Sequence, residues 1–199
     1  MPRHLCPHCN LHLNICVCAH CQRVSNQTPI TVLQHPTEVD RPKGTVRVLQ
    51  QCLERIHVVV GETPEQFAQA GFDIATGTAN AALLYPGPGS QSLEQAELAD
   101  VKHWLVLDGT WRKAARILHS NPGLQALPAF HFQQAPRSRY IIRKAPGPEA
   151  LSTAEAVHYL LQVVEPTTNS APIGQAMDAL VDKQLAQIPD HLRHHYPPR

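Results

Sequence analysis

Short apolar runs bounded by turn residues recur along the chain and predict buried β-strands. Each run is rich in β-branched and aliphatic residues and is too short for a typical helix, so a strand is the better assignment. The runs are 30–35, 56–60, 81–85, 103–107 and 139–143. The stretch Pro86-Gly-Pro-Gly-Ser90 follows the third run, and we expect it to be a loop because no regular element accommodates it.

Segments with apolar residues at helical spacing lie between and after these runs. They are 44–53, 64–70, 93–99, 110–118, 152–164 and 170–188. Thr110 is suited to cap the fourth segment, and Ser152 with Glu155 has the form of a capping box at the start of the fifth. Strands that alternate with helices predict an α/β fold with a mostly parallel sheet flanked by helices.

Ligands of such sheets bind beyond the carboxyl ends of the strands. The loops expected there are 35–41, 85–90, 108–111 and 143–153. The third places a carboxylate, a glycine that permits close approach and an aromatic ring at a strand exit, in the order Asp108-Gly109-Thr110-Trp111. A capped helix with a core tryptophan would give the same pattern.

The loop after the first strand combines a histidine, an acid and a base. His35, Glu38 and Arg41 suit a binding site, and a surface turn would have the same composition. The sequence has no P-loop, no dinucleotide-binding glycine motif, no G-x-S-x-G and no H-E-x-x-H. ATP hydrolysis, dinucleotide redox chemistry and esterase chemistry therefore lack their usual motifs.

Length and composition are those of an ordinary globular domain. The chain has 199 residues, of which 43% are hydrophobic and 17% are charged, and its formal net charge is +1. Such a balance indicates that any RNA-binding surface must be local. Basic residues do cluster, at Arg41, Lys43 and Arg47; at Arg112, Lys113 and Arg116; and at Arg137, Arg139, Arg143 and Lys144.

No apolar run approaches the roughly 18 residues of a membrane span, and the first residues have no secretory apolar region. We therefore expect a cytoplasmic protein with no membrane partner and with reduced cysteines.

Five of the six cysteines fall between positions 6 and 21, which indicates a metal site and not a disulfide framework. Four thiolates suit tetrahedral Zn²⁺, and a fully protein-bound ion is structural. Cys6 and Cys9 pair either with Cys18 and Cys21, which gives two C-x-x-C knuckles, or with Cys16 and Cys18. Spacing alone slightly favours the first set.

Several sequence blocks, taken in order, resemble the DTW-domain family from Cys6 to about residue 160. They are Cys6-x-x-Cys9 with Cys16-x-Cys18, Leu33-Gln-His35-Pro-x-Glu38-x-x-Arg41-Pro, Leu84-Tyr-Pro-Gly87, Leu107-Asp-Gly-Thr-Trp-Arg-Lys-Ala114, Tyr140-x-Ile-Arg143-Lys-Ala145 and Leu151-Ser-Thr-x-Glu-Ala156. The resemblance implies a SPOUT-like fold with a trefoil knot in the C-terminal half. It divides the chain into a zinc-binding segment (1–25), a catalytic domain (26–190) and a tail (191–199).

The resemblance also implies an activity. S-adenosylmethionine would donate its 3-amino-3-carboxypropyl group to N3 of a tRNA uridine, in the variable loop, and methylthioadenosine would leave. The expected partners are tRNA and the donor, and DNA is not among them. The resemblance implies no particular oligomeric state. In the family the metal block is C-x-x-C then C-x-C, which points to Zn²⁺ on Cys6, Cys9, Cys16 and Cys18, with Cys21 as a departure.

Roles for individual residues follow from matching these blocks. Catalytic roles are expected for Glu38, Arg41, Asp108, Thr110 and Trp111. Donor binding is expected from Leu84, Tyr85, Pro86, Gly87, Leu107, Asp108, Gly109, Tyr140, Ile142, Arg143, Leu151, Ser152 and Thr153. Phosphate contacts are expected from Lys113, Arg116, Arg143 and Lys144.

Two other functions suit the same sequence. The first is a SPOUT methyltransferase, which would use the same donor and release S-adenosylhomocysteine. The second is a non-enzymatic RNA-binding module built on the zinc knuckle, which would bind no donor.

Overall fold

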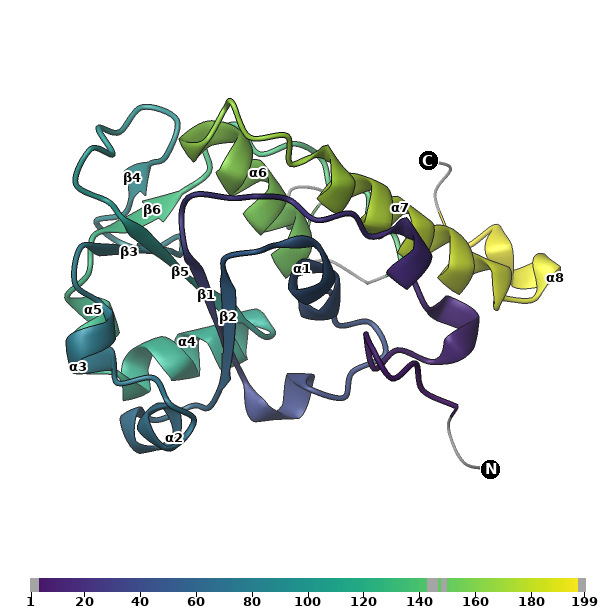
Figure 1. Ribbon diagram of the computed structural model, residues 1–199, viewed down its shortest axis with the longest axis horizontal. Helices are drawn as coiled ribbons and strands as arrows, with labels where there is room; N and C mark the ends of the chain where they lie inside the picture. The colour runs from purple at the N-terminus through teal and green to yellow at the C-terminus, as the bar shows by residue number, and fades with distance from the viewer. Residues whose placement is uncertain (1–3, 143–146, 148–149, 197–199) are drawn as a thin grey trace.

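The computed structural model describes residues 4–142, 147 and 150–196. Its centre is a six-stranded sheet, which Figure 1 shows between two groups of helices. The strand order is β2-β1-β5-β3-β6-β4, and every neighbouring pair is parallel. The predicted α/β fold with a parallel sheet is thus confirmed. The strands are β1 (Ile30–Gln34), β2 (Ile56–Val60), β3 (Ala81–Leu84), β4 (Gln91–Ser92), β5 (His103–Asp108) and β6 (Ala129–His131).

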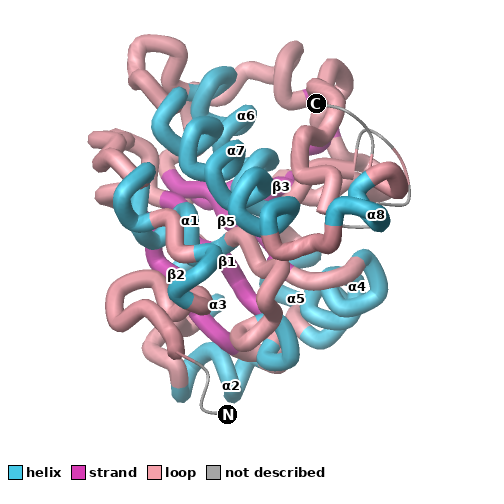
Figure 2. Tube along the Cα trace, turned by 90° about the vertical axis from the view of Figure 1, so that its right-hand side faces the viewer, coloured by secondary structure: helices cyan, strands magenta, loops and turns pink. Residues whose placement is uncertain are grey.

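Helices cover both faces of the sheet, as Figures 1 and 2 show. One layer consists of α1 (Val46–Cys52), α6 (Thr153–Val164) and α7 (Ala171–Ala186), which contact one another. The other layer consists of α2 (Pro64–Gln69), α3 (Ile74–Gly77), α4 (Trp111–Ser120) and α5 (Pro122–Gln125). Single turns η1 (Leu13–Ile15), η2 (Cys18–His20), η3 (Pro36–Glu38) and α8 (Asp190–Arg193) complete the elements.

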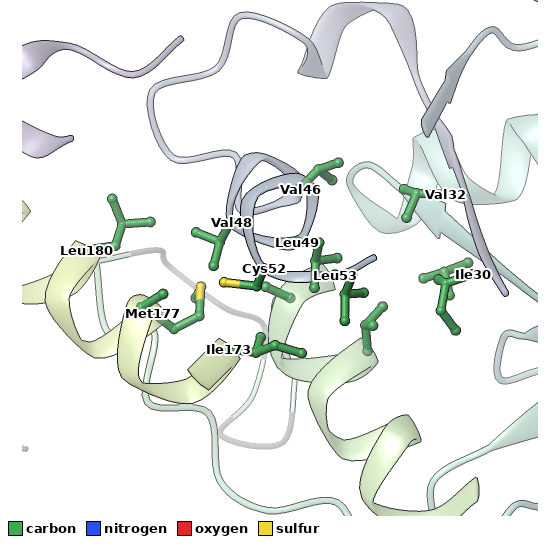
Figure 3. Packing of buried hydrophobic residues seen from close by; sticks show 14 of the residues in the cluster. Ile30, Val32, Val46, Val48, Leu49, Cys52, Leu53, Ile173, Met177 and Leu180 are labelled. Carbon is green, nitrogen blue, oxygen red and sulfur yellow. The ribbon is translucent and has the colours of Figure 1, made fainter. Parts of the chain in front are cut away.

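Alternate residues of each central strand face opposite layers, because side chains of a strand alternate in direction. In β1, Ile30 and Val32 belong to the hydrophobic cluster under α1, α6 and α7, whereas Leu33 belongs to the cluster under the other helices. In β5, Trp104 and Leu105 divide in the same way. Figure 3 shows the first cluster, where residues of α1 lie between the sheet and α7. Such two-sided burial explains why the strands are near-continuous apolar runs.

The cysteine-rich N-terminal segment packs on α1 and α7. Ile15 and Val17 are buried in the same cluster as those helices, and η1 and η2 contact α7. Arg47 donates a hydrogen bond to the Asn10 carbonyl at 2.6 Å, and Gln51 donates to the His8 carbonyl at 3.0 Å. The segment therefore shares the hydrophobic core of the rest of the chain.

The helix predicted over 93–99 is wrong, since the structure has turns there. The Leu93 N–H donates to the His131 carbonyl at 2.9 Å and continues the pairing of β4 with β6. The Glu94 carboxylate accepts the N–H groups of Gln133 and Gln134, both at 3.0 Å. These long-range contacts override the local helix propensity of the segment.

The strand predicted over 139–143 is also wrong for residues 139–142, and Arg143 lies outside the described residues. The Glu155 carboxylate accepts the N–H of Arg139 at 2.7 Å and of Tyr140 at 3.1 Å, so these groups are not available to a neighbouring strand. The segment after Pro189, where the sequence pattern predicts no helix, contains α8.

Helix boundaries otherwise follow the sequence signals. Ser152 and Glu155 form the predicted capping box at the start of α6, and Thr110 caps α4. In the described part of the chain, no helix is long and apolar enough to cross a membrane.

Candidate active site and metal centre

Four cysteine sulfurs of the N-terminal segment converge. The sulfurs of Cys6, Cys9, Cys16 and Cys18 all lie within 4.8 Å of one another. Cys6 Sγ is 3.7 Å from Cys18 Sγ, and Cys9 Sγ is 3.8 Å from Cys16 Sγ. A tetrahedral Zn²⁺ with Zn–S bonds of about 2.3 Å requires sulfurs about 3.8 Å apart. The geometry and the donor set therefore fit a closed Zn(Cys)₄ site.

A tight turn positions the first two sulfurs. Leu5 and His12 form an antiparallel bridge, and Asn10 closes the turn with a φ of 53°, which asparagine tolerates better than most residues. Hydrogen bonds from the N–H groups of Cys9 and His8 lower the pKa of the Cys6 thiol to about 6.

By contrast, burial raises the pKa of two other thiols in the cluster, those of Cys9 and Cys18. Four thiolates this close repel one another, and a divalent cation would compensate their charge.

Cys21 lies apart from this cluster. It interacts with Cys52 of α1, and the Cys52 thiol together with burial raises the pKa of Cys21. The set with Cys18 and Cys21, which spacing alone slightly favours, is therefore not the set that converges in the structure. The four sulfurs that converge are the set implied by the family resemblance.

A cavity of about 360 Å³ lies at the carboxyl ends of β3 and β5 and beside β6. Nine residues expected from the sequence to bind the donor or to act in catalysis line it: Leu84, Tyr85, Pro86, Leu107, Gly109, Thr110, Trp111, Leu151 and Thr153. Its other lining residues are Val106, Ala114, His131, Phe132, Ala135, Ala150 and Ala156. A mainly apolar pocket with a few polar groups is typical of a small-molecule site.

The start of α4 forms the rim of this cavity. Trp111 is 52% exposed and meets Tyr85 edge to face, with ring centroids 6.2 Å apart, so it is not a core residue. A Cβ atom on Gly109 would lie 2.9 Å from the Lys113 Cβ, which explains the glycine at this turn. The Asp-Gly-Thr-Trp stretch therefore belongs to the cavity as well as to the helix cap.

Asp108 lies under the cavity and joins three elements. It is 7% exposed, and it pairs with Gln34 across β5 and β1. Gln34 Nε2 donates to Asp108 Oδ2 at 2.8 Å, and Thr153 Oγ1 donates to Asp108 Oδ1 at 2.5 Å. The capping box of α6 fixes Thr153 directly after Ser152. A buried carboxylate thus orients a hydroxyl in the cavity wall.

Other expected site residues lie outside this wall. Glu38 pairs with Lys113 at 2.5 Å, and Arg41 donates from Nε to the Thr37 carbonyl at 3.2 Å, so these two described side chains do not pair with each other. Tyr140 is buried toward α7, where its hydroxyl donates to Gln184 Oε1 at 3.1 Å. The remaining positions outside the wall are Gly87 in the loop before β4, the buried Ile142, and the capping residue Ser152.

The charged candidates for phosphate contacts divide into two groups. Lys113 forms an ion pair with Glu38, and Arg116 pairs with Glu62 at 2.5 Å while its side chain stays 60% exposed. Arg143 and Lys144 lie outside the described residues.

A polar network beside the cavity was not anticipated from the sequence. His35 accepts the Thr37 N–H at Nδ1, so its Nε2 carries the hydrogen that it donates to Glu62 at 2.6 Å. Burial raises the pKa of Glu62, but hydrogen bonds from His35 and Arg116 outweigh it and hold this pKa below its ordinary value. The only signal in the sequence was the position of Glu62 just after a predicted strand.

Glu94 is a second residue that sequence reasoning missed. It anchors the segment that includes Phe132 and Ala135 of the cavity wall by accepting two backbone N–H groups. It also accepts hydrogen bonds from the Ser92 hydroxyl at 3.0 Å and the Tyr159 hydroxyl at 3.1 Å. Burial opposes its ionisation, but the hydrogen bonds prevail and lower the pKa of Glu94 to about 2.

Comparison with known proteins identifies relatives of the whole domain. The DTW-domain family model matches residues 3–185. The chain is 33% identical to tRNA-uridine aminocarboxypropyltransferase 2 of Drosophila melanogaster over 82% of its own length and 67% of that protein. It is 26% identical to the proteins of the same name from Macaca fascicularis and Mus musculus, over 80% of its own length.

The chain spans 56% of the length of the macaque and mouse relatives. No solved structure matches it significantly. The family match covers nearly all of the chain and includes both the cysteine cluster and the cavity. The chain therefore belongs to the DTW-domain family.

Proposed function

We propose that this protein transfers the 3-amino-3-carboxypropyl group of S-adenosylmethionine to N3 of a uridine in the variable loop of tRNA. The proposal rests on the cavity at the carboxyl ends of β3 and β5, whose wall contains nine of the residues assigned by family resemblance. The names of the curated relatives support transfer of an aminocarboxypropyl group to a tRNA uridine. The protein is then a transferase with tRNA and S-adenosylmethionine as substrates.

The cavity suits the apolar parts of the donor. Leu84, Leu107 and Ala114 offer aliphatic surface for the adenosine and the methylthio group, while Thr110 and Thr153 supply hydroxyls at the rim. Trp111 has an exposed ring at the entrance, on which a base can stack. Arg41 is exposed in the loop that follows β1, the neighbour of β5 in the sheet, and we assign its guanidinium to the carboxylate of the transferred group.

The reaction balances with groups of this chain. The bond between N3 and the terminal carbon of the aminocarboxypropyl group forms while the bond from that carbon to sulfur breaks, and methylthioadenosine leaves with the electron pair on sulfur. The N3 proton passes to Thr153 Oγ1 while the Thr153 hydroxyl proton passes to Asp108 Oδ1, along the 2.5 Å hydrogen bond. Most of the catalysis is positioning, since the sulfonium is already a reactive centre.

Two further assignments accompany this function. Cys6, Cys9, Cys16 and Cys18 would hold Zn²⁺ in a structural role, since four thiolates leave no open position for chemistry. We also propose that the fold is of the SPOUT type with a knot in the C-terminal half, an assignment that comes from the family resemblance. The parallel sheet and the packing of α6 on β5 are compatible with it.

The decisive experiment is a reaction of the purified protein with unmodified tRNA and S-adenosylmethionine, followed by nucleoside mass spectrometry and identification of the spent donor. We expect 3-(3-amino-3-carboxypropyl)uridine together with methylthioadenosine. A methylated nucleoside with S-adenosylhomocysteine would instead establish a methyltransferase. Absence of donor binding would indicate a non-enzymatic RNA-binding module.

A further inference from the structure

A second cavity, of about 350 Å³, lies between the N-terminal cysteine segment, α1 and the edge strand β2. Its wall includes His8 and Asn10 from the cysteine segment, Gln34 from β1, Gln50 from α1 and Val60 from β2. None of the described residues proposed to bind the donor lines this cavity. It is therefore a space separate from the proposed donor site.

Two hydrogen bonds connect the walls of the two cavities. Gln34, in the wall of the second cavity, donates to Asp108 Oδ2, and Thr153, in the wall of the first, donates to Asp108 Oδ1. All three side chains come from elements that border the same face of the sheet. The walls of the two cavities are thus linked through the carboxylate of Asp108, the residue proposed to receive the proton, which itself lines neither cavity.

The second cavity offers neutral hydrogen-bonding groups. Gln34 Oε1 receives no hydrogen bond from any described residue, although its Nε2 is engaged. The side chain of Gln50 is exposed and has no described partner. Amide groups match the donors and acceptors on the edge of a nucleobase, and Val60 adds an aliphatic surface for its face.

The charged groups in this wall already have partners. Arg47 donates to the carbonyls of Asn10 and Val39, both at 2.6 Å, and Glu38 pairs with Lys113. A phosphate or another strongly charged ligand would have to compete with these contacts. An uncharged, planar and polar group is the better match for this wall.

We propose that the second cavity binds an unpaired nucleotide of the RNA that neighbours the target uridine. The proposal rests on the proposed function, because it assumes that the target reaches the first cavity. Binding of two adjacent unpaired bases would select a loop over a duplex, since a paired neighbour cannot enter. The metal-binding segment would then contribute His8 and Asn10 to RNA selection as well as stabilising the fold.

The first test fills the cavity and measures each substrate separately. In Val60→Trp and Gln50→Trp, we expect the KM for tRNA to rise about tenfold or more, which corresponds to loss of one base contact. Donor affinity, measured by calorimetry, should stay within about twofold. His57→Trp is the matched control, because His57 is exposed on the same strand but contacts Phe72 on the opposite face.

The second test removes the base instead of the cavity. Abasic sites are placed 5′ or 3′ of the target uridine in a tRNA substrate, and one of them should raise KM about tenfold for the unmodified protein. In Val60→Trp or Gln50→Trp, the same abasic site should raise KM little further. The abasic site and the substitution each remove the same interaction, so their effects should not add. Unchanged KM for both filled variants and both abasic tRNAs would overturn the proposal while product formation still supported the transferase.

A crosslinking experiment tests this proposal independently of catalytic activity. If the unmodified protein gave no product with any tRNA, the proposed function would fail. Photocrosslinking with 4-thiouridine next to the target position would still test the cavity. Crosslinks to residues 8–10 or 50–60 that disappear in Gln50→Trp support it, and their absence from the unmodified protein refutes it.

Discussion

The Thr153 hydroxyl donates a hydrogen bond to the Asp108 carboxylate at 2.5 Å, although 45 residues separate them in the chain. β5 ends at Asp108 and α6 begins at Thr153, so the contact joins a strand exit to a helix start. Gln34 holds the other carboxylate oxygen from β1. The position of the hydroxyl in the cavity wall therefore depends on three elements at once.

Removing the Thr153 hydroxyl or the Asp108 carboxylate should slow the chemical step strongly and should weaken donor binding much less. For Thr153→Val and Asp108→Asn we expect kcat to fall by about 10² to 10⁴, because proton transfer is lost, with a loss of donor affinity of less than about tenfold. Single-turnover kinetics and calorimetry measure the two effects. Thr31→Val is the control, since Thr31 is a buried threonine hydrogen-bonded to His103 at the other end of β1. Normal turnover in both variants would exclude the relay.

Glu94→Gln should loosen the segment that contributes Phe132 and Ala135 to the wall of the first cavity, where we propose that the donor binds. The amide keeps its size but loses the charge that holds the N–H groups of Gln133 and Gln134, so the free energy of unfolding should fall by about 1 to 3 kcal/mol. We also expect the donor dissociation constant to rise several-fold while kcat at saturation changes little. Isothermal titration calorimetry measures the donor dissociation constant, and denaturant unfolding measures the free energy of unfolding. Equal donor affinity in the two proteins would show that this anchor does not shape the cavity.

The same substitution should change the acid stability of the protein. The pKa of Glu94 is about 2 in the folded protein, below its ordinary value of 4.5, so its ionised form stabilises the fold at higher pH. That contribution is present above about pH 4.5 and is lost as the pH falls toward 2. The stability difference between the unmodified protein and Glu94→Gln should shrink over this range in urea titrations. A constant difference would mean that Glu94 does not ionise as the structure indicates.

Cys16 and Cys21 should differ in their effect on metal content. Cys16→Ser removes one of the four converging sulfurs and should reduce bound zinc well below one ion per chain, whereas Cys21→Ser should retain it. Metal analysis of the purified proteins makes the comparison. Chelation of the unmodified protein should lower its thermal stability, because the proposed metal would hold a segment that packs on α7. Loss of zinc from Cys21→Ser with retention in Cys16→Ser would reverse the ligand assignment.

Arg41→Ala should weaken donor binding about tenfold if its guanidinium binds the carboxylate of the donor. Arg41→Lys should recover part of the affinity, because it keeps the charge and loses the paired N–H geometry. Arg137→Ala, which removes another exposed arginine, is the control for a general change in surface charge. Unchanged donor affinity in Arg41→Ala would reject this role.

Local signals were enough to predict the elements that frame the site. The buried runs gave β1, β2, β3 and β5 nearly to the residue, and the Ser152 and Glu155 side chains marked the start of α6. These features depend on burial and capping, both of which act over a few residues. The position of the cavity then followed from the rule for parallel sheets.

Features that depend on distant partners could not be predicted. β6 has only three residues and is defined by its pairing with β3 and β4. Glu94 has helix-forming neighbours, and only its contact with Gln133 and Gln134 shows why the segment turns. The choice of Cys16 over Cys21 likewise depends on where the chain after η1 passes, which spacing alone does not determine.

The packing of the cysteine segment on α7 has a consequence for the order of events during synthesis. The cysteines are translated before α7, and the turn that carries the first of them closes through local contacts such as the bridge of Leu5 with His12. Ile15 and Val17, however, bury themselves in a cluster that includes residues of α7, which is translated much later. A nascent chain would thus carry a closed but undocked cysteine segment, with these two side chains open to water or to chaperones until α7 emerges.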